Sequence, residues 1–448
     1  MKITQFRSST FIIESNNKKI LFDPWLVNGE YYGSWYQYPE YDFEKNREKF
    51  NVDYICITHI HPDHFSRKTL AKLNKDIPII ILKYNQKFLR FNLEKLGFKV
   101  KEIENESSFK IGNLDLFFFA ADNCDPKICQ KVFGCGNFSK NNNKNESNFI
   151  DSIIVIKDNL SKNTLINAND CLFEMAKTIS YRIKKKFLNI DLLMTGYSGA
   201  GAYPQCFKNL NNTNKSLEGK KKRDKFLNNA LSFIDVFEPN YTIPFAGQYE
   251  LSGKLSKLND YRGVPNLLEA KSFINLKSNT NCLLPYFEKE FSIESLADAK
   301  EIDIRYYDGK KKYLKKISSF KLDYEKINEN ADIASIKKLI PNAYDNFERK
   351  RKELVFSSET QLYIELTESF YLLINFNGKS YSYETQVNKK LKKYIILKLD
   401  LRLLKLILMG PKYAHWNNAE IGSHITFYRK PDSLYERGMH YCMNFFHN

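Results

Sequence analysis

Three of the seven histidines of the chain, together with one aspartate, fall within the segment Thr58–His64, whose sequence is THIHPDH. The segment directly follows the apolar run Tyr54–Ile57, a pattern typical of a buried strand that ends where the polar residues begin. Imidazole nitrogens and carboxylate oxygens packed this closely suit zinc, iron or manganese. We therefore predict a metal site whose ligands are His59, His61, Asp63 and His64. The kink at the proline lets the first two ligands face one ion and the last two face another.

Two chemistries are open to such a site. A metal ion held by His59, His61 and a carboxylate lowers the pKa of bound water from about 15.7 to about 7, which supplies hydroxide for hydrolysis. Asp63 and His64 are then the candidate catalytic residues, with Asp63 orienting or deprotonating the water. The same ligands around iron, with open positions for dioxygen, suit a non-haem oxygenase, in which His59, His61 and Asp170 form the set of two histidines and one carboxylate.

Alternating strand and helix patterns surround these residues. Residues 3–23 predict a β-hairpin with Asn16 and Asn17 in its turn. Apolar runs then predict strands at 77–82, 98–103, 114–121, 152–157, 163–166, 192–195 and 241–247, with helices at 66–73 and 85–96. Asp170 follows the strand at 163–166, where it is either a ligand or the N-cap of the next helix. The alternation predicts α/β layers.

The pattern changes near Pro265. Strands are predicted at 361–366, 371–376 and 380–383, and Asn377-Gly378 is a strong hairpin signal between the second and third of them. Residues 394–399 are expected to continue this meander. We therefore divide the chain into a metal-binding catalytic domain at 1–265 and a smaller C-terminal α+β domain with antiparallel strands at 266–448.

Composition is that of an ordinary globular protein. Hydrophobic residues make up 43% of the 448 residues, which is enough for a sizeable core. No signal-peptide pattern opens the sequence and no apolar run approaches about 18 residues, so we expect a soluble, cytoplasmic protein without a membrane span. The eight cysteines form no CxxC pair, which argues against a zinc ribbon and against a Rieske cluster.

The net charge is strongly positive, at +17 from 69 basic and 52 acidic residues. Such a balance is compatible with nucleic acid, an anionic membrane or an anionic small substrate. Because lysine and asparagine are frequent throughout the chain, the basic runs are typical of solvated faces. We therefore expect an anionic small-molecule substrate and no nucleic-acid binding.

The HxHxDH pattern of residues 59–64 resembles the signature of the metallo-β-lactamase superfamily. Residues 167–171 (NANDC), 197–204 (YSGAGAYP) and 244–247 (PFAG) are similar to the metallo-β-lactamase-like part of the cytidine-monophospho-N-acetylneuraminate hydroxylase family. The resemblance implies an αββα sandwich, Asp170 as a bridging ligand, and Asp23 as a carboxylate that supports the histidine segment from behind.

The chain departs from the superfamily pattern in two respects. The two later histidine ligands are missing, because no histidine occurs between His64 and His415. Asp122 or Asp125 are expected to replace the first, and Gln248 can offer an amide oxygen in place of the second, which favours iron or manganese over zinc. The hydroxylase family also carries a Rieske iron-sulfur domain, so an oxygenase of this kind would need a separate electron-transfer protein.

These patterns together predict an α/β protein with one or two divalent metal ions, iron or zinc with manganese as a further choice. We expect a metal-dependent enzyme acting on an anionic sugar-nucleotide-like or phosphorylated substrate through metal-activated water or dioxygen. The alternatives are a phosphoester or amide hydrolase unrelated to sialic acid, and a non-catalytic binding module on a partly decayed metal site. The expected ligands are His59, His61, Asp63, His64, Asp170 and Asp122.

Overall fold

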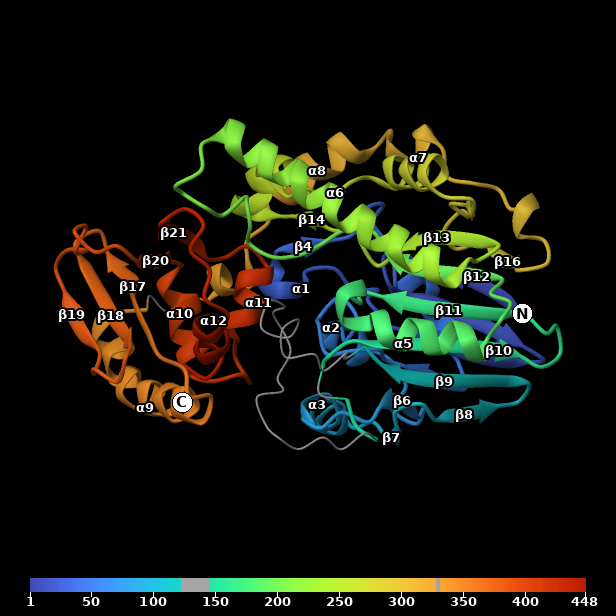
Figure 1. Cartoon of the computed structure of the whole chain (residues 1–448), viewed down its shortest axis with the longest axis horizontal. Helices are drawn as coiled ribbons and strands as arrows, with labels where there is room; N and C mark the ends of the chain where they lie inside the picture. The colour runs from blue at the N-terminus through green and yellow to red at the C-terminus, as the bar shows by residue number, and fades with distance from the viewer. Residues whose placement is uncertain (122–144, 148, 328–330) are drawn as a thin grey trace.

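The computed structural model describes residues 1–121, 145–147, 149–327 and 331–448, and two seven-stranded sheets dominate it (Figure 1). The first sheet has the order β16-β1-β2-β3-β5-β6-β7 and consists of β1 (Lys2–Gln5), β2 (Phe11–Ser15), β3 (Lys18–Phe22), β5 (Tyr54–Cys56), β6 (Ile79–Leu82), β7 (Val100–Ile103) and β16 (Glu290–Ser292). The second has the order β15-β13-β12-β11-β10-β9-β8 and consists of β8 (Ser108–Ile111), β9 (Leu114–Ala120), β10 (Ser152–Asp158), β11 (Thr164–Asn169), β12 (Leu192–Gly196), β13 (Tyr241–Phe245) and β15 (Asn281–Cys282).

Both sheets follow from local sequence. The predicted hairpin is confirmed: β2 and β3 pair antiparallel around Asn16 and Asn17, which both have positive φ, as a tight hairpin turn requires. The four residues of β6 are completely buried, and β6 pairs in parallel with β5 and β7. A continuous apolar run is what a parallel strand covered on both faces needs.

Helices complete the layers. The main core lies between the sheets and contains Phe11, Phe22, Phe118 and Ile154. On the second sheet, α5 (Phe173–Lys186) and α6 (Asn212–Phe237) cover the outer face (Figure 1) and share a further core with it. On the side of the first sheet lie α2 (Arg67–Leu70) and α3 (Phe88–Lys95), which bury leucines against the main core. The predicted α/β fold class with an αββα sandwich is confirmed.

Residues beyond position 265 extend both sheets. β15 adds to β13 in the second sheet, and β16 pairs with β1 in the first, with Lys2 opposite Ser292. The division of the chain at residue 265 stays a prediction, and the paired strands of the N-terminal sandwich run to Ser292. The connecting elements are α1 (Glu30–Gly33), the β-ribbon of β4 (Trp35–Tyr36) with β14 (Glu250–Leu251), α7 (Leu267–Lys277) and α8 (Lys310–Ser318).

Residues 331–448, called the C-terminal unit below, form a five-stranded sheet of order β19-β18-β17-β20-β21 packed against helices. Its elements are α9 (Ile333–Glu353), β17 (Ser358–Thr367), β18 (Phe370–Phe376), β19 (Ser382–Glu384), β20 (Tyr394–Lys398), α10 (Leu401–Leu408), α11 (Trp416–Ile421), β21 (Thr426–Lys430) and α12 (Arg437–Met443). The hairpin at Asn377-Gly378 is confirmed, because β18 and β19 pair antiparallel across it.

The predicted continuation of the meander is wrong. β20 pairs in parallel with β17, on the opposite side of β17 from β18. Every residue of β19 is partly exposed, so β19 offers no buried face, whereas β17 presents Leu362 and Ile364 to the core beside Ile395 and Leu397. β20 therefore buries more apolar surface beside β17 than it would beside β19.

All the predicted ligands of the described residues lie at one edge of the sandwich. β5 runs parallel to β3, and β11, β12 and β13 run parallel to one another. His59, in the segment after β5, and Asp170, after β11, have side-chain atoms 4.0 Å apart, so the two strands end at the same edge of the sandwich. In Figure 1 this is the edge that faces α1 and the C-terminal unit.

The end of β12 is packed closely against the segment that carries Asp170. A Cβ atom on Gly196 would lie 2.6 Å from the carbonyl oxygen of Asn169 and 3.6 Å from the Cα of Asp170. We predict that Gly196→Ala lowers the free energy of unfolding by about 1–3 kcal/mol, because backbone must shift to make room. Urea denaturation measures this. In the control Gly309→Ala a Cβ atom would approach only the end of a side chain, the Tyr38 hydroxyl at 3.2 Å, so this variant should lower the free energy of unfolding by less than Gly196→Ala does.

Candidate metal centre

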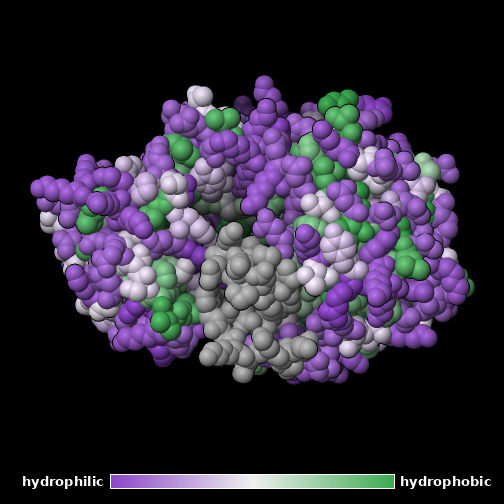
Figure 2. Space-filling view, viewed as in Figure 1, coloured by the Kyte–Doolittle hydropathy of each residue, from purple (hydrophilic) through white to green (hydrophobic). Residues whose placement is uncertain are grey.

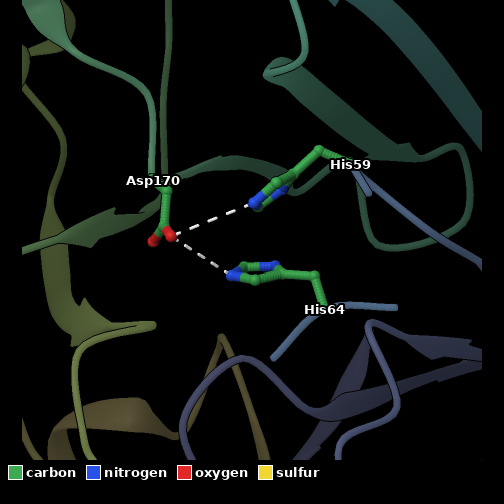
Figure 3. Close-up of side chains that lie close together, drawn as sticks. All are labelled: His59, His64 and Asp170. Carbon is green, nitrogen blue, oxygen red and sulfur yellow. Dashed lines mark ion pairs between the residues drawn. The ribbon is translucent and has the colours of Figure 1, made fainter. Parts of the chain in front are cut away.

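The predicted ligands converge on a small buried volume. The Nε2 atoms of His59 and His64 lie 4.0 Å and 3.4 Å from the same oxygen of Asp170, with both rings pointing at that carboxylate (Figure 3). Asp63 lies beside them, with its Oδ2 3.7 Å from His64 Nε2. Asp170 does not cap α5, whose N-cap is Leu172. The structure therefore brings together five of the six predicted ligands, and Asp122 lies outside the described residues, as does Asp125.

A further carboxylate, which the sequence analysis did not select, completes a second group. Asp151 Oδ1 lies 3.9 Å from His59 Nε2, and His59, His61 and Asp151 each offer a ligand atom within 4.8 Å of the others. The set His59, His64 and Asp170 satisfies the same condition. The structure thus groups His59 and His61 with Asp151, and pairs Asp170 more closely with His64.

Asp23 supports the histidine segment from behind, as the resemblance implied. Its carboxylate is completely buried and accepts hydrogen bonds from the Thr58 amide at 2.7 Å, the Thr58 hydroxyl at 2.8 Å and His64 Nδ1 at 2.8 Å. Since Nδ1 of His64 donates to Asp23, Nε2 is left for a metal ion. That Nε2 atom is buried and makes no hydrogen bond within the described residues.

Burial sets the protonation of the ring nitrogens. It lowers the pKa of His59 well below the ordinary value, and the neighbouring histidines add to this. The pKa of His61 is lowered by burial as well. Both rings are therefore neutral at physiological pH, which is the form that binds metals. Burial also lowers the pKa of His64, but the carboxylates of Asp23 and Asp170 outweigh it and raise that pKa well above its usual value.

The carboxylates suit this site to a cation. Burial raises the pKa of Asp151 well above its ordinary value, and the negative charge of Asp170 raises it further. The pKa of Asp63 is raised by burial too. Asp151 Oδ1 makes no hydrogen bond within the described residues. A buried carboxylate without a donor is costly unless a metal ion neutralises it, so the residues at this edge fit a divalent metal.

A small pocket opens beside the carboxylates of Asp63 and Asp170. Its other polar lining residues include Ser8, Ser198 and Gln248, and Tyr249 and Trp35 supply aromatic surface. Ser198 donates to the Gly247 carbonyl, whereas Oε1 of Gln248 is buried and makes no hydrogen bond within the described residues. Among the described residues, the lining of the pocket therefore offers neutral polar groups and carboxylates and includes no lysine or arginine.

The backbone around the site is unusual. Ser8, Asp23, Tyr31, Asn169 and Ala246 all have positive φ, between 32° and 54°. Residues other than glycine rarely adopt this backbone conformation, and it persists only where the surrounding contacts hold it. Such residues concentrate at functional sites.

The four C-terminal histidines belong to neither candidate metal group. His415 and His424 are enclosed in the protein, and burial lowers the pKa of each to about 4. His440 pairs with Glu420 at 3.2 Å. His447 is half-buried next to the C-terminal residue. The prediction that these residues serve packing or the surface agrees with these positions.

Comparison with known proteins shows what this chain is similar to. Residues 2–137 match the family model described as the beta-lactamase superfamily domain. The chain is 29% identical over 273 residues to a putative Rieske 2Fe-2S iron-sulfur protein of Mycolicibacterium smegmatis, covering 59% of this chain and 47% of that protein. It is 25% identical over 260 residues to the cytidine monophosphate-N-acetylneuraminic acid hydroxylase of Xenopus laevis, covering 56% and 38%. The chain thus spans less than half of each of these relatives.

Solved structures with a similar arrangement include an isothiocyanate hydrolase from Delia radicum gut bacteria, with a TM-score of 0.43, 15% identity and coverage of 65% of this chain and 99% of that one. CmlA, a diiron beta-hydroxylase from Streptomyces venezuelae, has a TM-score of 0.40, 13% identity and coverage of 65% and 54%. The match to the beta-lactamase superfamily domain falls on residues 2–137, and the αββα fold and the clustered ligand residues of the N-terminal part are consistent with it. Within the described part of the chain, no helix has the length and apolar character needed to cross a membrane.

Asp23 provides a test of how the histidine segment is held. We predict that Asp23→Asn lowers the free energy of unfolding by about 1.5–3 kcal/mol, because a buried charged acceptor of three hydrogen bonds is lost. It should also weaken metal binding about 10- to 100-fold, since His64 loses its orienting partner. Urea unfolding and chelator competition measure the two effects. Asp53→Asn, whose carboxylate pairs with Lys18 at the surface, is the control and should leave metal binding unchanged.

The ionised carboxylate of Asp151 should lower the free energy of unfolding when no metal is bound. Its pKa in the folded chain lies above that of an unfolded aspartate, about 3.9, so ionisation is penalised only in the folded state. The penalty is absent below about pH 4 and grows as the pH rises. We predict that Asp151→Asn raises the free energy of unfolding in EDTA at pH 7.5 by about 1–3 kcal/mol, with no gain near pH 4. A less stable variant at pH 7.5 in EDTA would contradict this.

Proposed function

We propose that the chain is a metal-dependent oxygenase, with one divalent ion held by His59, His61 and Asp151 and a second by Asp63, His64 and Asp170. The observation that carries the proposal is the ligand set: two neutral imidazoles and a buried carboxylate without a hydrogen-bond donor at its Oδ1. Two histidines and one carboxylate are the set that non-haem iron oxygenases use, and the oxygen-rich surroundings favour iron or manganese over zinc.

The residues around the ions would each have a definite task. Asp170 lies within 4.0 Å of both His59 and His64, so its carboxylate can reach both ions. Asp23 fixes the tautomer of His64. Iron bound here would supply the chemistry of dioxygen activation. Gln248 and Ser198 would orient a neutral polar part of the substrate, because they face the pocket next to Asp63 and Asp170.

The substrate proposal rests on the relatives and on charge. Relatives named cytidine monophosphate-N-acetylneuraminic acid hydroxylase act, by that name, on a sugar nucleotide, and the net charge of +17 favours an anionic ligand. Because no basic side chain is among the described residues that line the pocket, we place the anionic part of the substrate away from Asp63 and Asp170. Electrons would come from a Rieske-type protein or domain outside these residues, since the sequence has no Cys-x-His pair of the kind that binds a Rieske cluster. A cytoplasmic location stays a prediction.

A hydrolase is the second candidate, and the environment of Asp63 favours it. Burial raises the pKa of this carboxyl group, which brings it closer to the range in which a carboxylate takes a proton from an activated water. Asp63 would then be the general base, while His64 beside it holds the second ion. A metal ion held here would supply activated water for the cleavage of a phosphoester or an amide, and Asp63 would take the proton of that water.

Elemental analysis of protein purified without added metal tests the proposal. We compare the wild type with His61→Ala, Asp151→Ala and Asp170→Ala. The oxygenase proposal predicts iron in the wild type, lost partly or wholly in all three variants, and consumption of dioxygen when an electron donor and a sugar nucleotide are supplied. The control Asp53→Ala, at the surface, should keep the wild-type content.

The other outcomes separate the candidates. Zinc near two ions per chain, together with cleavage of phosphoesters, would favour the hydrolase. A wild type that binds no metal, even after incubation with ferrous iron or zinc, would contradict both enzyme proposals and favour a binding module. Metal that is retained in Asp151→Ala but lost in His61→Ala would exclude Asp151 as a ligand.

A further inference from the structure

A buried tyrosine connects a candidate metal ligand to the rest of the molecule. The hydroxyl of Tyr31 donates a hydrogen bond of 2.6 Å to Oδ1 of Asp63, and the Tyr31 residue is only 3% exposed. The other oxygen of Asp63 faces His64 Nε2 at 3.7 Å. The hydroxyl therefore determines which oxygen of Asp63 points toward the proposed second ion.

The backbone that presents Tyr31 is strained. Tyr31 and Tyr32 have φ values of 49° and 58°, which are unfavourable for residues other than glycine. Gly29 and Gly33, on either side, have φ values of 90° and 84° and complete the left-handed turn. Two consecutive tyrosines hold this conformation only if contacts from outside the turn fix them.

Those contacts come from the C-terminal unit. His424 Nε2 donates to the Tyr31 carbonyl at 2.7 Å, and the amide of His415 donates to the Tyr32 hydroxyl at 2.7 Å. A neutral His424 carries one ring proton, so its Nδ1 accepts from the Tyr324 hydroxyl at 3.2 Å. In Figure 1, α1, which contains both tyrosines, lies beside α11 of the C-terminal unit, and the two helices are in contact.

We propose that the C-terminal unit is part of the metal centre: His424 fixes the backbone of Tyr31, and the Tyr31 hydroxyl then holds Asp63 in the orientation that binds the second ion. Tyr31 and His424 are positioning residues that act through Asp63. The inference rests on the proposed function in taking Asp63 as a ligand. It assigns the C-terminal unit a task at the site without any contact to substrate.

Cobalt(II) titration of the metal-free full-length protein tests the inference. The visible absorption of bound cobalt reports its ligand geometry, and chelator competition gives the affinity. We expect Tyr31→Phe to lower the affinity for the second cobalt ion about 10- to 100-fold and to change the spectrum of that ion, while the first ion binds as in the wild type. Tyr344→Phe is the matched control, because this buried hydroxyl donates at 2.8 Å to the Lys379 carbonyl, in the C-terminal unit.

Substitutions of His424 test the second link. His424→Leu removes the donor to the Tyr31 carbonyl. Like Tyr31→Phe, it should lower the affinity for the second cobalt ion. His424→Gln keeps a side-chain N–H donor and should restore most of the affinity. A purely structural role of His424 would instead lower the melting temperature of both variants without changing the cobalt spectrum, and that result would overturn the inference.

Asp63→Asn separates failure of this inference from failure of the proposed function. If the wild type binds two cobalt ions and Asp63→Asn loses the second, the proposed ligand role of Asp63 holds. An unchanged spectrum and affinity in Tyr31→Phe would then overturn the positioning role alone. If Asp63→Asn binds both ions as the wild type does, the ligand role of Asp63 fails, and this inference fails with it.

Discussion

The carboxylate of Asp23 is the group on which the arrangement of the metal centre depends. It stands at the end of β3 and accepts hydrogen bonds from Thr58 and His64, which follow the parallel neighbour β5. One buried side chain therefore ties two strand ends together and fixes the ring of a ligand at the same time. Because Asp23 has no exposure to water, each of these donors must come from the protein.

Mutual repulsion among carboxylates explains why this edge of the sandwich is suited to metal. Asp63, Asp151 and Asp170 lie around three imidazoles, and burial makes ionisation of Asp63 and Asp151 costly in the metal-free protein. A divalent cation reverses the sign of that interaction. The same groups that destabilise the metal-free fold thus stabilise the loaded one, so metal binding and folding stability are coupled.

Residues 59–64 could be found from the sequence because their chemistry is contiguous and follows an apolar strand. Asp170 could be found for a similar reason, at the end of β11. Asp151 stands alone before an apolar run, and only the pairing of β10 with β11 brings it to the site. Antiparallel strands place the start of one beside the end of the other, and Ser152 and Asn169 are indeed joined by a hydrogen bond. The available signal was a carboxylate just before β10, the strand that comes before β11 in the chain.

Long-range pairing was the part of the fold that local patterns could not supply. β8 is short and alternately exposed at the edge of its sheet, so it gave no clear apolar run. The parallel placement of β20 against β17 depends on which edge offers a buried face, which is a property of the assembled unit. Contacts such as His424 with Tyr31 join residues far apart in the chain, and no spacing rule predicts them.

The pairing of β1 with β16 has a consequence for synthesis on the ribosome. β1 finds one of its two neighbours in the sheet only after Ser292 has been translated, and β13 finds its neighbour β15 only shortly before that. Until then the unpaired sides of β1 and β13 offer backbone groups that can pair with another nascent chain. A ribosome that stalls between residues 265 and 292 would therefore hold a nearly complete sandwich that is most exposed to misassembly.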